Sequence, residues 1–151
     1  MGVVSVMTIR RLLARKGAFV PSIRSDAKIA DVVEQLELDD AGALVVTDDG
    51  RRICGIISER DIVRGLQLRP QEELMQLPVR ELMSTQVYTC DIAEPMTAVY
   101  ELMNRCQIRH VPVTEHGELR GIITMLDVVR YLLDEARLEA DSLKDYVIRQ
   151  V

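Results

Sequence analysis

The sequence has few of the residues on which nucleic-acid binding and enzyme catalysis usually depend. Its 151 residues include no Trp, one Phe, four Tyr and two His, and aromatic residues make up 3%. Platforms for stacking bases are therefore not expected, and a net charge of −5 offers no basic surface to a nucleic-acid backbone. With only His110 and His116 available, a histidine-based catalytic group is difficult to assemble.

Cysteine and long apolar runs are also scarce. Cys54, Cys90 and Cys106 form no CxxC pair and have no zinc-ligand spacing with histidine. We therefore expect free thiols, no metal and a cytoplasmic protein. No apolar run approaches the roughly 20 residues of a membrane span, and the first residues lack the features of a signal peptide. What remains, 48% hydrophobic and 28% charged residues, is typical of a globular domain.

A nine-residue motif occurs twice. Residues 54–62 and 120–128 both read x-Gly-Ile-Ile-Ser/Thr-x-x-Asp-apolar, and the copies begin 66 positions apart. This spacing indicates an internal duplication. The two isoleucines after glycine suit a short buried strand, and Ser58 or Thr124 then stands where it would cap a following helix.

The carboxylates of the motif, Asp61 and Asp127, have two interpretations. A carboxylate beside a helix N-terminus can accept hydrogen bonds from the vicinal hydroxyls of a ribose, while the helix dipole favours a bound anion. Alternatively, Ser/Thr-x-x-Asp is a capping box with no role beyond the helix start. The motif alone leaves both interpretations open.

Hydrophobic periodicity predicts the same order of elements in both halves. The first half has a helix over 8–16, an extended segment at 19–21, a helix from Ser25, strands at 43–47 and 53–57, and a helix over 61–68. The second has a helical segment at 79–83, an extended segment at 87–89, a helix over 94–104, and strands at 111–114 and 119–123. We predict a mixed α/β (α+β) fold of two tandem β-α-β-β-α repeats with pseudo-twofold symmetry, their small sheets packed against helices. The expected boundaries are 8–68 for the first repeat, 69–78 for a polar connection, 79–132 for the second repeat and 133–151 for a helical extension.

The last helix begins near Met125 and is predicted to run to about Tyr146. Its apolar stripe continues past the point where the first repeat stops. A helix that extends beyond its domain with an apolar face usually packs on something. The sequence does not decide whether this face packs on the chain's own N-terminal segment or on another subunit.

The duplicated unit resembles the cystathionine-β-synthase (CBS) domain pair, or Bateman module. The resemblance covers roughly residues 8–132, and Ile-Arg-His-Val-Pro-Val at 108–113 also matches a common CBS pattern, with 41–46 as a looser counterpart. It implies a non-enzymatic sensor that binds AMP, ADP, ATP or NAD(H) between the repeats, with S-adenosylmethionine ranked behind them. It also implies disc-like homodimers.

The resemblance implies roles for individual residues. Asp61 and Asp127 would hold the ribose hydroxyls at two sites, with Ser58 and Thr124 as their hydroxyl partners. The residues expected to line the bases are Val20, Ala43, Ile57, Val111 with Pro112 beside it, and Ile123. Thr89 and Asp91 would contact the adenine edge.

The cations expected at the phosphates differ between the repeats. Arg60 precedes the first aspartate, whereas Arg109 and His110 precede the middle strand of the second repeat. We therefore expect unequal sites, and the hypothesis is that Asp127, Thr124, Arg109 and His110 form the better one. The alternative is that these cations are solvated or paired on the surface.

Three classes of function follow from the sequence. The first is a regulatory adenine-nucleotide sensor that alters contacts within a dimer or with an unknown regulated protein. The second is an interaction or scaffold module that acts through 125–147, with nucleotide only structural. The third is an enzyme such as a nucleotide hydrolase, for which no catalytic base beside a nucleophile is found.

Overall fold

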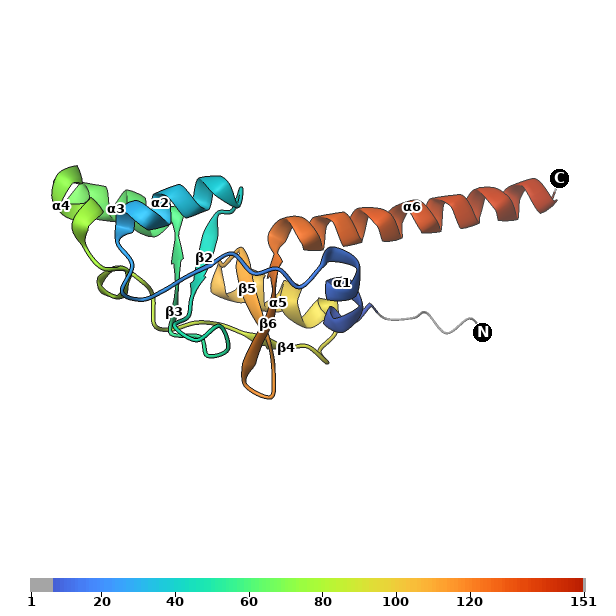
Figure 1. The fold of residues 1–151 in the computed structure, drawn as a ribbon. Helices are drawn as coiled ribbons and strands as arrows, with labels where there is room; N and C mark the ends of the chain where they lie inside the picture. The colour runs from blue at the N-terminus through green and yellow to red at the C-terminus, as the bar shows by residue number, and fades with distance from the viewer. Residues whose placement is uncertain (1–6, 151) are drawn as a thin grey trace.

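The computed structural model describes residues 7–150, in which two similar units follow one another (Figure 1). The first contains α1 (Ile9–Lys16), β1 (Ser22–Ile23), α2 (Ile29–Leu38), β2 (Ala43–Val46), β3 (Gly55–Ser58) and α3 (Glu59–Leu68). A connecting α4 (Gln71–Gln76) and the 3₁₀ helix η1 (Val79–Glu81) lead to the second unit. That unit contains β4 (Cys90–Asp91), α5 (Met96–Cys106), β5 (His110–Glu115), β6 (Glu118–Thr124) and α6 (Met125–Gln150).

Each unit contains one three-stranded sheet of the same topology. The strand orders are β1-β2-β3 and β4-β5-β6, with the first pair parallel and the second antiparallel in both sheets. The parallel pairs are joined through α2 and α5, which provide the crossover that parallel strands require. The predicted duplicated β-α-β-β-α architecture is therefore confirmed.

Two helices begin later than predicted, and in each case a residue at the predicted start bonds a residue outside the helix. The backbone N–H and hydroxyl of Ser25 donate to the Asp48 carboxylate at 2.9 Å each, so Ser25 holds a loop and α2 starts at Ile29. Glu94 accepts a hydrogen bond from the Asp91 N–H at 2.9 Å. The fifth helix consequently starts at Met96.

The connection 69–78 is more structured than its polar composition predicted. Residues Gln71–Gln76 form α4, and Leu74 within it is fully buried in the core of the first unit. Val79, at the start of η1, is buried in the same core. Leu74, Met75 and Leu77 are too few and too closely spaced to give the helical periodicity that would have predicted this helix.

The segment that leads into each unit packs in the hydrophobic core of the other unit. Ile9 and Leu13 of α1 belong to the core of the second unit, whereas Leu74 and Val79 belong to the core of the first. Backbone hydrogen bonds link the same segments. The Ile9 N–H donates to the Glu94 carbonyl oxygen at 3.0 Å, and the Val79 N–H donates to the Ala27 carbonyl oxygen at 2.8 Å. Each unit is thus completed by the segment that precedes the other one.

The motif glycines make this exchange possible. A Cβ on Gly55 would lie 2.7 Å from Met83 Sδ and 2.8 Å from the Ser84 carbonyl oxygen, and one on Gly121 would lie 2.7 Å from the δ carbons of Leu13. Both distances are far shorter than ordinary carbon contacts. The glycines therefore allow the exchanged segments to lie directly against β3 and β6.

Candidate functional site

The two aspartates of the motif are held by the same local geometry. Asp61 Oδ2 accepts the backbone N–H of Ser58 at 2.8 Å and its hydroxyl at 3.0 Å. Asp127 Oδ2 accepts the same two bonds from Thr124 at the same distances. Both aspartates therefore cap the helix that follows, and these bonds leave open whether either carboxylate also binds a ligand. Because both bonds at Asp61 use Oδ2, its Oδ1 takes no part in the cap.

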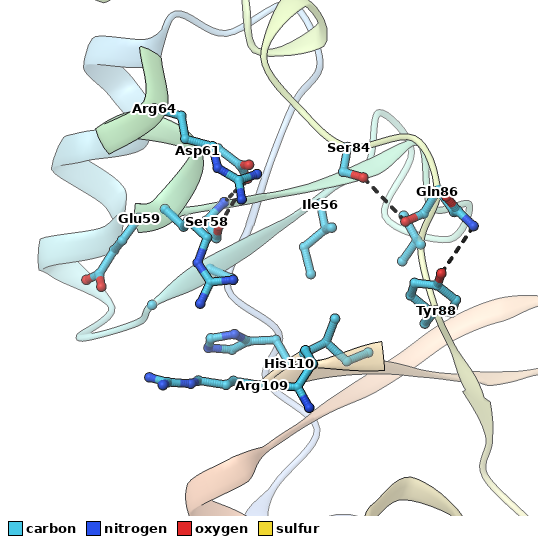
Figure 2. A pocket seen from close by; sticks show the side chains of 16 residues that line it. Ile56, Ser58, Glu59, Asp61, Arg64, Ser84, Gln86, Tyr88, Arg109 and His110 are labelled. Atoms are coloured by element: carbon cyan, nitrogen blue, oxygen red, sulfur yellow. Dashed lines mark hydrogen bonds between the residues drawn. The ribbon is translucent and has the colours of Figure 1, made fainter. Parts of the chain in front are cut away.

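Only the first of these carboxylates lines the cleft between the two repeats. This inter-repeat cleft has a volume of about 420 Å³, within the range of small-molecule sites. Its walls come from both units and from the segment that joins them (Figure 2). The lining residues are Gly42, Ala43, Ile56, Ser58, Glu59, Arg60, Asp61, Arg64, Ser84, Gln86, Val87, Tyr88, Gln107, Ile108, Arg109 and His110.

The cleft combines apolar, hydroxyl and cationic walls. Ile56, Val87 and Ile108 supply aliphatic surface. Tyr88 lies beside them, and its hydroxyl accepts a hydrogen bond from Gln86 Nε2 at 3.2 Å (Figure 2). This arrangement offers a flat ring an apolar surface and offers its polar edge the backbone of the 84–88 segment.

The charges of the cleft differ from those of the whole chain. Arg60, Arg64 and Arg109 line it, against the two carboxylates of Glu59 and Asp61, although the net charge of the chain is −5. Guanidinium groups bind phosphate oxygens through paired hydrogen bonds. A ligand that carries both hydroxyls and a phosphate therefore finds chemistry for each within one cavity.

Six of the predicted site residues meet in this cleft. They are Ala43, Ser58, Arg60, Asp61, Arg109 and His110. The other predicted residues do not line the cleft. Those that are buried are Ile57, Val111, Pro112 and Ile123. Val20 and Thr124 are partly buried, and Thr89 and Asp91 are exposed next to the 84–88 segment.

The structure groups the predicted cations differently from the sequence-based hypothesis. Arg109 and His110 line the cleft with Ser58 and Asp61, although they belong to the same repeat as Asp127. Figure 2 shows the side chains of Arg109, just before β5, and His110, its first residue, extending toward the first repeat. The reason is that β5 begins at the junction of the two units, so its first residues face the other repeat. Gly42 adjoins His110, whose imidazole would lie 3.2 Å from a Cβ at that position.

The Asp127 carboxylate is instead bound by a lysine from the same chain. Lys16 Nζ donates to Asp127 Oδ2 and to the Ile122 carbonyl oxygen, the latter at 2.7 Å. The side chains of Lys16 and Asp127 are 26% and 11% exposed. Burial by itself would raise the pKa of Asp127, but bonds from Lys16 and Thr124 outweigh it and hold the pKa below its usual range. The second motif is therefore engaged in an internal ion pair.

Sequence reasoning missed the aliphatic residues that line the cleft and the lining residues of the 84–88 segment. Ile57 was predicted to line a base, but it is fully buried, and Ile56 lines the cleft in its place. Side chains alternate along a strand, so Ile56 shares the face of Ser58 while Ile57 points into the core. That alternation was a signal available in the sequence. Ser84 and Gln86 had no comparable signal, because only the fold brings them to the cleft.

His110 introduces a pH dependence at this junction. Burial lowers the pKa of its imidazole, while Glu59 acts in the opposite direction. Folding therefore favours the neutral ring. Stability has its full value above the unfolded-state pKa of about 6.5 and is lost as the pH falls from there through the lower folded-state pKa.

We accordingly expect the melting temperature to fall as the pH is lowered from about 7.5 to 5.5, and to fall less in His110→Gln. Thermal unfolding monitored by circular dichroism across this range measures the difference. His116→Gln is the matched control, since His116 lies exposed in the β5–β6 turn. Equal pH slopes in His110→Gln and wild type would contradict the assignment.

Comparison with known proteins identifies the fold and its family. The CBS domain family model matches residues 18–68 and 79–134. The chain belongs to the CBS-domain family. CBS domain pairs are generally regulatory modules, typically not enzymes, and often bind adenine nucleotides.

Individual CBS relatives agree with this assignment. The crystal structure of a CBS-domain containing protein from Agrobacterium tumefaciens has a TM-score of 0.78 and 33% identity, covering 86% of this chain and 97% of that one. Hypoxic response protein 1 of Mycobacterium tuberculosis is 29% identical over 133 residues, covering 86% of this chain and 89% of that protein.

An uncharacterized 17.7 kDa protein of Acidianus ambivalens is 31% identical over 113 residues, covering 74% of this chain. This chain spans 66% of that relative and 40% of a 33.4 kDa Thermofilum pendens relative.

Residues 7–150 contain neither a metal-binding cluster nor a membrane-spanning helix. No group of three or more His, Cys, Asp or Glu side chains there is placed to hold a metal ion. The described helices include none that is both long and apolar enough to cross a membrane. The cysteines are free thiols, and burial raises the pKa of Cys90 to about 12, so this thiol stays protonated and unreactive at neutral pH.

Proposed function

We propose that this CBS pair is a regulatory module that binds one adenine nucleotide, AMP, ADP or ATP, in the inter-repeat cleft. The observation that supports this most directly is the placement of Asp61 and three arginines around one cavity of about 420 Å³. In the proposed pose, Asp61 Oδ1 and Ser58 bind the ribose hydroxyls. The base lies against the aliphatic wall of Ile56, Val87 and Ile108, and the phosphates lie toward Arg60, Arg64 and Arg109.

Regulation would follow from the position of this cleft. Its walls belong to both repeats and to the 84–88 segment, so one ligand contacts all three parts. A ligand that contacts them better in one relative arrangement increases the population of that arrangement. The change would pass to a second copy of the chain or to a regulated protein, and no bond of the nucleotide needs to be broken.

The experiment is isothermal titration calorimetry of the purified chain with AMP, ADP, ATP, NADH and S-adenosylmethionine. We expect micromolar binding with a stoichiometry of one and no release of phosphate or adenine. NADH tests whether the cleft accepts a second nucleoside, and S-adenosylmethionine tests whether phosphate is required. Absence of binding by every compound would overturn the proposal and favour an interaction module.

The Lys16 ion pair predicts the stoichiometry. In the wild type, the Lys16 ammonium bonds Asp127 Oδ2, the oxygen that also accepts the cap, so a ligand hydroxyl at this carboxylate would compete with a charged, partly buried partner. Lys16→Met removes the ammonium but keeps much of the aliphatic chain, and we expect a second AMP to bind at Asp127. Titration of the variant measures this as a stoichiometry near two.

The matched control is Lys28→Met, because the Lys28 ammonium bonds only the neutral amide of Gln76, at 2.9 Å. Its stoichiometry should stay at one. A second binding event in the wild type, or a stoichiometry of one in Lys16→Met, would show that Lys16 does not close the second motif.

A further inference from the structure

Helix α6 carries an apolar face that nothing in the described part of the chain covers. It runs from Met125 to Gln150, and every residue from 132 to 150 is exposed. Leu133 and Leu143 are 54% and 65% exposed. Figure 1 shows α6 extending well beyond the second unit. Packing of α6 on its own chain is therefore confined to its first two turns, where Val128 and Tyr131 meet the core.

Seven exposed apolar residues of α6 form a regular stripe. Its members are Leu126, Val129, Leu133, Ala136, Ala140, Leu143 and Val147. They alternate in steps of three and four, which is the seven-residue repeat of a left-handed coiled coil. An isolated surface helix that needed only solubility would have polar residues at these positions.

The stripe lies opposite the face that α6 uses within its own chain. Successive residues rotate by about 100° around a helix, so Val128 and Tyr131 project about 160° away from the Leu126–Val129 edge. Of these, Val128 is buried and Tyr131 partly buried, whereas Leu126 and Val129 are 55% and 42% exposed. Met125 packs on the core at one edge of the first turn, so a second helix reaches the stripe there from the side of Leu126.

Flanking charges favour an identical helix in parallel orientation. Glu139 lies on one side of the stripe, and Arg130, Arg137 and Lys144 lie on the other. In a parallel pair, Glu139 of each copy faces Lys144 of the other, which is the cross-helix pairing that sets coiled-coil orientation. An antiparallel pair would place the three basic positions against one another and Glu139 against its own copy.

We propose that α6 pairs in parallel with α6 of a second copy as a two-stranded coiled coil along residues 126–147. The bodies of the two copies then lie on the outer sides of the pair, because their contacts use the opposite face of the helix. This assembly does not depend on the nucleotide proposal. It places the two inter-repeat clefts in one particle.

The first test is the mass of the full chain in solution by sedimentation velocity. We expect the double variant Leu133→Glu/Leu143→Glu to have half the mass of the wild-type particle. Leu138→Glu is the matched control, because Leu138 is 68% exposed but lies on the opposite face of α6. It should keep the wild-type mass. An unchanged mass in the double variant, or a monomeric wild type, would overturn the proposal.

The orientation is tested by Gln150→Cys, which adds a thiol on the line of the stripe without removing an apolar residue. In a parallel pair the two thiols face each other, and mild oxidation should produce a cross-linked dimer on a non-reducing gel. In an antiparallel pair they lie at opposite ends and do not cross-link. The wild type controls for Cys54 and Cys106, which are partly exposed.

Either result can be separated from the nucleotide proposal. Titration of the double variant with AMP reports the cleft alone, since neither substituted leucine lines it. Loss of assembly with retained AMP binding supports both proposals. Retained assembly overturns only the coiled coil.

Discussion

Replacing Asp61 with alanine is expected to weaken AMP binding by about tenfold to a hundredfold. The range corresponds to the loss of a hydrogen bond to a charged group, about 1.5–3 kcal/mol. Asp61 has one oxygen committed to the Ser58 cap and lines the cleft with its carboxylate. Alanine leaves a ribose without its acceptor, and titration calorimetry with AMP measures the change in Kd.

The matched control is Asp127→Ala. It removes a carboxylate with the same two capping bonds from Thr124, so its effect on the local helix start should be similar. It does not line the inter-repeat cleft, and AMP affinity should stay within about twofold of wild type. Loss of binding in Asp127→Ala with retention in Asp61→Ala would return the site to the second motif. Equal losses of AMP affinity in both variants would indicate that the two aspartates only stabilise the starts of their helices.

Replacing Ile9 with alanine is expected to destabilise the second repeat, although Ile9 lies before the first. The side chain is fully buried in the core of the second unit, among Val99, Met103 and Val111. A buried Ile→Ala change costs about 2–5 kcal/mol, because a cavity remains where the side chain was. At roughly 3 °C per kcal/mol for a chain of this size, the melting temperature should fall by about 6–15 °C.

Leu38→Ala is the control for this experiment, since Leu38 is 71% exposed at the end of α2. Its melting temperature should remain within about 2 °C of wild type. Amide hydrogen exchange then locates the effect. Protection in Ile9→Ala should fall first in β4, β5 and β6, whereas equal losses in both sheets would mean that the two cores unfold together.

Much of the fold could be predicted because its signals are local. The duplicated Gly-Ile-Ile-Ser/Thr-x-x-Asp motif places a strand, a cap and a helix within nine residues, and the capping bonds at Ser58 and Thr124 have the expected form. The structure confirms both repeats and their sheet topology. The errors at Ser25 and Glu94 arose where a side chain at the predicted helix start bonds a residue outside the helix, Asp48 for Ser25 and Asp91 for Glu94.

The site was predictable only in part, because its members come from three separate stretches. Ser58 and Asp61 were found through their motif, and Arg109 and His110 through the pattern before the fifth strand. The sequence did not predict that these four residues line the same cleft. The repeat to which a strand belongs does not decide which cleft its first residues face. Ser84 and Gln86 carry no motif and enter the cleft through the path of the chain.

The sequence by itself determined the duplication, the order of the elements, the helix-capping aspartates and the apolar stripe of the last helix. These depend on contacts within a few residues or on periodicity along one element. The tertiary structure alone decided that α1 completes the second core, that Lys16 binds Asp127, and that Arg109 and His110 face Asp61. Each joins residues that are distant in sequence, and their meeting depends on how the two repeats pack rather than on any local preference.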